Sequence, residues 1–180
     1  LEECSKKMKK IIIVIILTGF SIFVNGQSVI CPAINSFTGE WLYSNGQDTI
    51  RIYLRANDYT VSQSSNIVSN LLGWHEYKKG NTIVESNYNN RFMTLPTSSN
   101  NEVPRSYSIF LLMPQCDNSK HKLIGKIDDI TQCYESKVVT IQFNTAQNQL
   151  IWKQRQPTGF GFATGCKGMT LPSEFILTKQ

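Results

Sequence analysis

The sequence predicts an all-β protein, an antiparallel up-and-down barrel of about eight to ten strands. A strong two-residue turn signal, Asn45-Gly46, lies between two alternating apolar runs. Further short runs of this kind recur along the chain with turn-forming residues between them. We find no ten-residue stretch with the 3.6-residue period of an amphipathic helix. Closing a barrel also removes the exposed edges that many short strands would leave.

The first 26 residues have the features of a secretory signal. Residues 1–7 precede Met8, the expected start, and we interpret them as an upstream extension. Segment 8–26 is interpreted as a signal peptide, with Lys9 and Lys10 before an apolar core. This core is shorter than the roughly 20 residues of a membrane-spanning helix. The alternatives are a membrane anchor and a lipoprotein attached at Cys31. We expect residues 27–180 to form one secreted or periplasmic domain, with no membrane span after signal removal.

The charge pattern argues against a nucleic-acid partner. Without the charged residues of the first 26 positions, the formal net charge falls from +5 to +3. The remaining basic residues are scattered, and only Lys78 and Lys79 are adjacent. A nucleic-acid-binding surface normally shows a clustered basic stripe or patch.

Four of the five cysteines, Cys31, Cys116, Cys133 and Cys166, lie in the expected mature chain. An even number after a signal peptide predicts two disulfides formed in an oxidising compartment. Of the three possible connectivities we favour Cys116 with Cys133 and Cys31 with Cys166.

The Asn45-Gly46 turn would fix the register of a first hairpin over residues 37–55. Taking these two residues as the centre of the turn places Trp41 opposite Ile50 and Glu40 opposite Arg51. The alternation then predicts one buried face, made by Phe37, Gly39, Trp41, Ile50, Ile52 and Leu54.

The other expected strands follow in order. After a turn at Asn57-Asp58 they cover residues 59–63, 71–77, 82–86, 91–95, 107–113, 122–127, 138–143, 150–154 and 174–178. Segment 64–70 is polar and predicted to be a loop, and a turn is expected around Lys79-Gly80-Asn81.

The segment from Phe37 to Trp41 resembles the G-x-W opening of lipocalin-like barrels. In that family the tryptophan packs across the closed end of the barrel and an arginine stacks on it. The resemblance implies a lipocalin-like barrel with Trp41 as its plug, and Arg155 is the candidate for the stacking cation.

A second resemblance covers nearly all of the expected mature chain. It is carried by Gly39-x-Trp41-x-Tyr43, by Leu72-Gly73 with Tyr77 and Gly80, and by the final stretch from Leu171 to Gln180. These elements are similar to a family of small secreted bacterial proteins classed as a domain of unknown function. The resemblance implies secretion by a Gram-negative bacterium and a single β-domain, and it implies no activity.

Motifs for catalysis, metals and cofactors are missing from the sequence. We find no nucleophile motif, and the histidines His75 and His121 stand alone. The acidic residues Asp117, Asp128 and Asp129 lack the spacing of a calcium loop and are interpreted as solvated turns. We therefore predict no enzyme activity, no metal and no cofactor.

The aromatic residues indicate a binding module. Barrels of this size can hold one small apolar ligand. The predicted lining residues are Trp74, Tyr107, Phe143 and Trp152. The open alternative is a barrel packed solid by the same side chains.

The second functional hypothesis is a protein-interaction module, such as an inhibitor of a hydrolase. Its contact residues would be Phe160 and Phe162, which lie in a glycine-rich loop.

Overall fold

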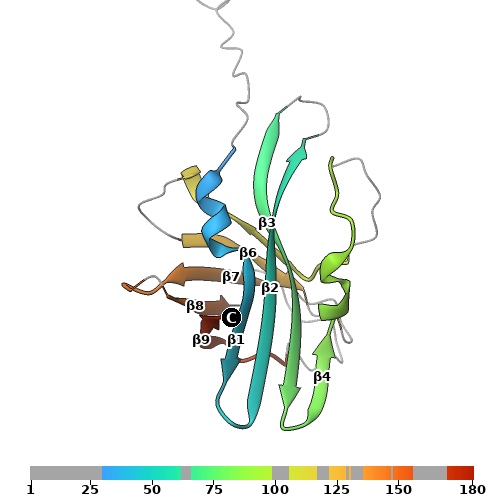
Figure 1. Ribbon diagram of the computed structural model, residues 1–180, viewed down its shortest axis with the longest axis vertical. Coiled ribbons are helices and arrows are strands. Elements are labelled where there is room, and N and C mark those ends of the chain that lie inside the picture. Colours follow the sequence, from blue (N-terminus) through green and yellow to red (C-terminus); the bar gives the residue numbers. More distant parts are fainter. Residues whose placement is uncertain are drawn as a thin grey trace, which may run out of the picture.

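The protein is a closed antiparallel barrel of eight strands with a ninth strand attached, as the computed structural model shows (Figure 1). The structure describes residues 30–61, 66–98, 106–116, 122–128, 130, 136–146, 148–155 and 170–180. The predicted fold class is therefore confirmed. The predicted extension 1–7 and signal peptide 8–26 lie outside the described residues.

The strands are β1 (Gly39–Ser44), β2 (Asp48–Thr60), β3 (Ile67–Lys79), β4 (Thr82–Ser86), β5 (Ile109–Leu112), β6 (Lys122–Asp128), β7 (Ser136–Phe143), β8 (Gln149–Arg155) and β9 (Glu174–Lys179). Three short 3₁₀ helices accompany them: η1 (Pro32–Phe37), η2 (Tyr88–Phe92) and η3 (Pro114–Cys116). None of the helices in the described part of the chain is long and apolar enough to cross a membrane.

Strand β3 has two partners along one edge. It pairs with β2 over its whole length, and the two strands extend beyond the rest of the sheet (Figure 1). On the other edge, Leu71–Gly73 pair with β5, whereas Glu76–Lys79 pair with β4. The remaining neighbours follow chain order, and β9 returns to β1 and closes the barrel. The attached strand β4 therefore branches from the barrel at the middle of β3.

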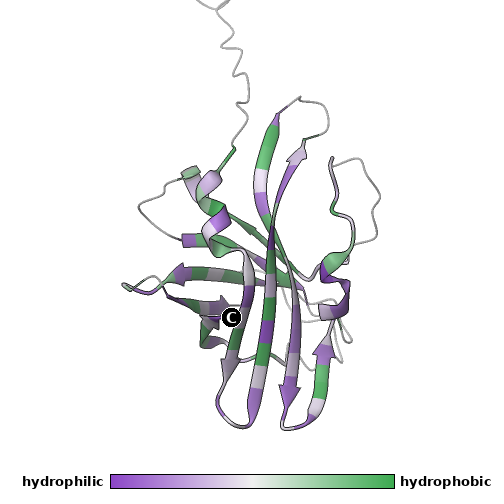
Figure 2. Cartoon of the chain, in the orientation of Figure 1, coloured by the Kyte–Doolittle hydropathy of each residue, from purple (hydrophilic) through white to green (hydrophobic). Residues whose placement is uncertain are grey.

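Alternating side chains place the core inside the barrel. The hydropathy colours alternate along β2, as period-2 strand geometry requires (Figure 2). The interior contains the fully buried Trp41, Ile50, Ile52 and Leu54 from the first hairpin, together with Phe37 of η1. The predicted buried face is confirmed for these five residues, while Gly39 is half-buried.

The predicted register of the first hairpin is wrong by two residues. Trp41 lies opposite Ile52, Glu40 lies opposite Tyr53, and Arg51 faces Leu42. Asn45 is the residue before the turn and not its first central residue. Its side-chain Oδ1 accepts hydrogen bonds from the backbone N–H groups of Gln47 and Asp48. Gly46, with φ of 91°, then takes the first central position of the turn. A shift of two keeps every side chain on its face, so the buried set survives.

Other predicted elements agree unevenly with the structure. The strands over 122–127, 138–143, 150–154 and 174–178 are confirmed as parts of β6, β7, β8 and β9, and the turn before β4 is confirmed. The turn at Asn57-Asp58 is wrong because β2 continues through it. Residues 67–70 form strand rather than loop.

The predicted strand over 91–95 is also wrong. Arg91 and Phe92 end the 3₁₀ helix η2, in which the Asn90 N–H donates to the Asn87 carbonyl. The Arg91 guanidinium stacks on the rings of Tyr88 and Phe92, 4.3 Å from each centroid. These local contacts favour the helical turn over an extended chain.

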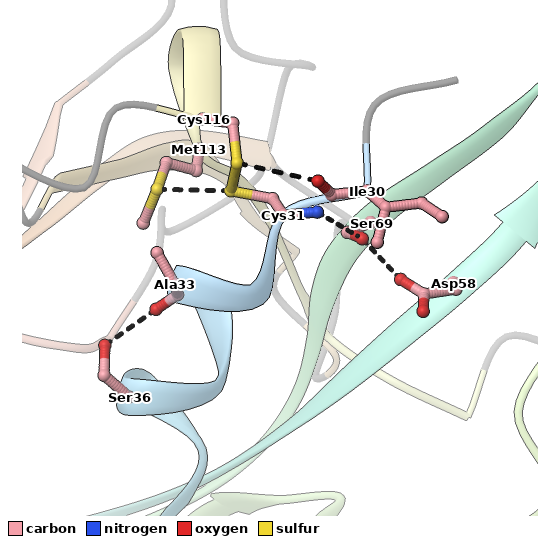
Figure 3. Close-up of a disulfide and its surroundings, with 8 residues drawn as sticks. All are labelled: Ile30, Cys31, Ala33, Ser36, Asp58, Ser69, Met113 and Cys116. Carbon is pink, nitrogen blue, oxygen red and sulfur yellow. Dashed lines mark hydrogen bonds between the residues drawn. A yellow bond between two sulfur atoms is a disulfide. The ribbon is translucent and has the colours of Figure 1, made fainter.

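A disulfide joins Cys31, just before η1, to Cys116 at the end of η3 (Figure 3). The Met113 sulfur lies 3.5 Å from Cys31 Sγ, and the Cys31 N–H donates to Ser69 Oγ. Both predicted pairings, Cys116 with Cys133 and Cys31 with Cys166, are therefore wrong. The reason is tertiary: β5 and η3 bring Cys116 beside the start of η1. Cys133 and Cys166 lie outside the described residues.

We predict that peptide mapping of the oxidised protein recovers a Cys31–Cys116 linked peptide. The double substitution Cys31→Ser and Cys116→Ser should lower the free energy of unfolding by about 4 kcal/mol, because this bond closes a long loop in the unfolded chain. Denaturant unfolding of both forms measures the loss. Recovery of a Cys116–Cys133 peptide instead would contradict the structure.

Candidate functional site

The structure does not bring the four predicted ligand residues together. Trp152 faces inward and stacks on Phe175, with ring centroids 5.4 Å apart. Phe143 lies near η1, 4.5 Å from the ring of Phe37. Tyr107 precedes β5 and is half-buried. The predicted interaction residues Phe160 and Phe162 lie outside the described residues.

Trp74 faces outward, which corrects its predicted place inside the barrel. A Cβ atom on its neighbour Gly73 would point inward at Leu54 and Ile109. Because successive side chains of a strand point to opposite faces, Trp74 lies on the outer face of β3. There it lies across from Tyr53, and the Arg55 guanidinium lies 5.8 Å from its ring centroid. Trp74 is nevertheless fully buried. A second packed layer therefore covers the outer face of β2 and β3.

Trp41 is fully buried in the interior beside η1. Its indole N–H donates to the Phe37 carbonyl at 2.8 Å, and the Phe143 ring packs edge-on against it. The stacking cation is Lys179 of β9, whose Nζ lies 5.3 Å from the Trp41 ring centroid. Arg155, the predicted cation, is instead exposed at the end of β8.

The inward-facing side chains fill the middle of the barrel. Residues from all eight barrel strands, among them Ile52, Leu71, Ile109, Ile141 and Trp152, have at most 1% of their surface exposed. A methyl group added to Gly73 would lie 2.7 Å from Leu54 Cδ2 and 2.9 Å from Ile109 Cβ. The geometry around Gly73 therefore matches the packed alternative rather than the hollow one.

A buried polar cluster lies where β3 changes partner from β5 to β4. His75 Nδ1 is 2.7 Å from Ser108 Oγ, and His75 Nε2 is 3.2 Å from Glu85 Oε1. The Nε2–Oε1 contact has the distance of an ion pair but not the alignment of a hydrogen bond. His75, Glu85 and Ser108 are each at most 3% exposed.

These three residue types also make up catalytic triads. Ser108 Oγ, however, is buried and also lies 3.3 Å from Asn87 Oδ1. Asn87 precedes η2, and its Oδ1 accepts the His75 backbone N–H while its N–H donates to the His75 carbonyl. The arrangement therefore fastens β4, η2 and the start of β5 to β3.

The outer layer carries what we call the aromatic–arginine surface, made by Tyr53, Arg55, Tyr88, Arg91, Phe92 and Met93. Phe92 is 71% exposed and Met93 is 44% exposed. The Phe92 ring nevertheless has fixed neighbours, since Tyr53 packs edge-on against it at 5.9 Å and Arg91 stacks on it. One Arg55 nitrogen donates to the carbonyls of both Arg91 and Met93 at 2.9 Å. Exposed apolar groups are thus held in one position.

Two buried tyrosines carry shifted pKa values. Burial raises the pKa of Tyr77 to about 12, and the hydrogen bond that its hydroxyl donates to Asp48 adds to the effect. The same hydrogen bond is the main cause that lowers the pKa of Asp48. Burial likewise raises the pKa of Tyr88 to about 12, helped by its hydrogen bond to Glu40.

Sequence reasoning missed both the buried cluster and the outer surface. From the sequence, His75 stood alone, without a partner for catalysis or metal binding. Residues 75, 85, 87 and 108 meet only because β3 pairs with both β4 and β5, and no spacing along the chain signals this. Phe92 and Met93 lie within the strand that the sequence predicted over residues 91–95, so their exposure could not be expected.

The described residues also bear on metal binding. No three His, Cys, Asp or Glu side chains gather within the described ranges. Asp128 accepts hydrogen bonds from Lys126 and Ser136, while Asp117, Asp129 and His121 lie outside the described residues.

The fold and the outer surface define a small, packed, all-β barrel with a disulfide. The chain belongs to a protein family of unknown function, DUF6705, whose model matches residues 8–180. The expected membership of a family of unknown function is confirmed. Neither a curated protein nor a solved structure matches the chain.

We predict that two tyrosines titrate late, near pH 12, in the folded protein. Because folding raises both pKa values, it favours the protonated hydroxyls. This stabilisation is complete below pH 10, the ordinary value, and is lost as pH rises towards 12. Absorbance at 295 nm measures the titration. Tyr77→Phe and Tyr88→Phe should each remove one late-titrating group, and an unchanged late step in either variant would contradict the assignment.

Proposed function

We propose that this protein is a secreted or periplasmic protein-interaction module that binds its partner through the aromatic–arginine surface. The observation that carries the proposal is the 71% exposure of Phe92 on a backbone held by Arg55. Leaving this ring and Met93 exposed gives up the stabilisation that their burial would provide. Aromatic and arginine side chains in fixed positions are the groups that contribute most energy at protein interfaces.

The charges around this surface favour an acidic partner. Four positive charges lie on or beside it, those of Arg51, Arg55, Lys78 and Arg91. Two negative charges lie there too, those of Glu40 and Glu76. Among the described residues, the excess of two positive charges would attract an acidic protein surface and speed encounter at low salt. An apolar pocket on the partner would receive Phe92.

The packing favours this surface over the interior as the binding site. A small hydrophobic ligand inside the barrel remains a prediction from the sequence, but the filled space around Gly73 does not support it. The Cys31–Cys116 disulfide supports the proposed location, because disulfides persist in oxidising compartments. The proposal assigns no catalytic role to the chain.

The test compares Phe92→Ala with a matched control, Ile176→Ala. Ile176 is 50% exposed on β9, so its truncation removes a similar apolar group elsewhere on the barrel. Immobilised wild-type and variant proteins would capture partners from the culture medium and extract of the producing organism. Biolayer interferometry with each purified partner then gives Kd.

We predict that Phe92→Ala weakens binding by roughly 30-fold or more, as expected for an interface hot spot. Ile176→Ala should bind like the wild type, and added salt should weaken wild-type binding. Equal binding by Phe92→Ala and the wild type would refute the proposal, as would the absence of any partner that binds saturably.

A further inference from the structure

We infer that the turn between β1 and β2 is a self-modification site, in which the Asn45 side chain loses ammonia and forms a succinimide with Gly46. Both residues are exposed in this turn. The reaction needs no enzyme and no cofactor, because the nucleophile and the carbonyl that it attacks belong to adjacent residues. The modification does not involve the aromatic–arginine surface, so it goes beyond the proposed function.

The reaction exchanges one carbon–nitrogen bond for another. Water or hydroxide takes the proton from the Gly46 backbone nitrogen, which attacks the side-chain carbonyl carbon of Asn45 and forms the N–Cγ bond. The Cγ–Nδ2 bond then breaks, and Nδ2 takes a proton from water and leaves as ammonia. Water next opens the succinimide ring at either carbonyl, which gives an aspartyl or an isoaspartyl residue. No atom is oxidised or reduced in these steps.

The Gly46 nitrogen is accessible as the nucleophile. Among the described residues, no acceptor receives a hydrogen bond from the Gly46 N–H. A Cβ atom added to Gly46 would meet nothing within 4 Å, so no other part of the chain covers this position. Glycine also allows the φ of 91° that the turn requires here. Neither a side chain nor a competing hydrogen bond therefore blocks the approach of this nitrogen to the Asn45 side chain.

Two backbone donors already point at the oxygen on which negative charge develops. Asn45 Oδ1 accepts the Gln47 N–H at 3.0 Å and the Asp48 N–H at 2.7 Å. Attack on the carbonyl carbon converts this oxygen into an oxyanion, and hydrogen bonds to a charged acceptor are stronger than those to a neutral one. The turn therefore stabilises the transition state more than the ground state, as an oxyanion hole does.

A carboxylate faces the nitrogen that leaves. Asn45 Nδ2 donates to Asp48 Oδ2 at 3.3 Å. The pKa of Asp48 is lowered, mainly because the Tyr77 hydroxyl donates to its Oδ1, so this carboxylate is charged at neutral pH. Positive charge develops on Nδ2 as it takes up its proton, and the nearby negative charge stabilises it. The nucleophile, the oxyanion donors and the counter-charge thus all lie within residues 45–48.

The test follows the aspartyl and isoaspartyl products at position 45 by peptide mapping. The disulfide-intact protein is incubated at pH 8, both in buffer and in guanidinium chloride at a concentration that unfolds it. We expect the native protein to react about tenfold faster than the unfolded chain, because two hydrogen bonds become charge-assisted only in the native turn. An equal or slower native reaction would overturn the inference, since the hydrogen bonds would then protect the amide.

The variant Asp48→Asn removes the charge beside Nδ2 and keeps the backbone N–H. It should slow the native reaction by about fivefold, the effect of one charge contact in water, and leave the rate in guanidinium chloride unchanged. The control Tyr77→Phe removes the other hydrogen bond of Asp48 but keeps its carboxylate, so the native rate should match the wild type. A native rate that Asp48→Asn leaves unchanged, or that Tyr77→Phe lowers equally, would overturn the inference.

Discussion

The structure depends on close packing between β2, β3 and β5 at Gly73. This residue lies between Leu54 and Ile109, and the space for even one methyl group is already occupied. Side chains in such a core interlock at crystal-like density. The barrel is therefore tightly packed at this point, and the aromatic–arginine surface lies on its outer face.

Strand β3 belongs to the barrel and also carries the outer layer. The edge of β3 passes from β5 to β4 near His75, whose Nδ1 lies 2.7 Å from Ser108 Oγ and whose backbone N–H donates to Asn87 Oδ1. Asn87 leads directly into η2, so one buried cluster joins the barrel to the aromatic–arginine surface. Exposed Phe92 is held from one side by this cluster and from the other by Arg55.

Local patterns predicted those parts of the fold that depend on local physics. Strands β6 to β9 alternate cleanly, so their positions could be predicted from period 2. The hairpin kept its buried face for the same reason, although its register required the side-chain hydrogen bonds of Asn45. The outward side of Trp74 could not be predicted, because β3 is buried on both faces and lacks alternation.

Contacts between distant segments could not be predicted. The partner of Cys31 is 85 residues away and is selected by the position of η3. The His75 cluster depends on the branching of β3, and the aromatic–arginine surface depends on a 3₁₀ turn whose apolar residues have the composition of a strand.

The stability of Gly73→Ala tests the packed barrel most directly. In an extended strand with free space, this substitution should stabilise the protein slightly, because alanine restricts the unfolded chain. In the packed interior, the added methyl group meets Leu54 and Ile109, and Ile109 Cβ is fixed by the backbone. The account predicts a loss of about 1–3 kcal/mol in the free energy of unfolding. Unchanged or increased stability in denaturant unfolding would show that the barrel has room inside, and would contradict it.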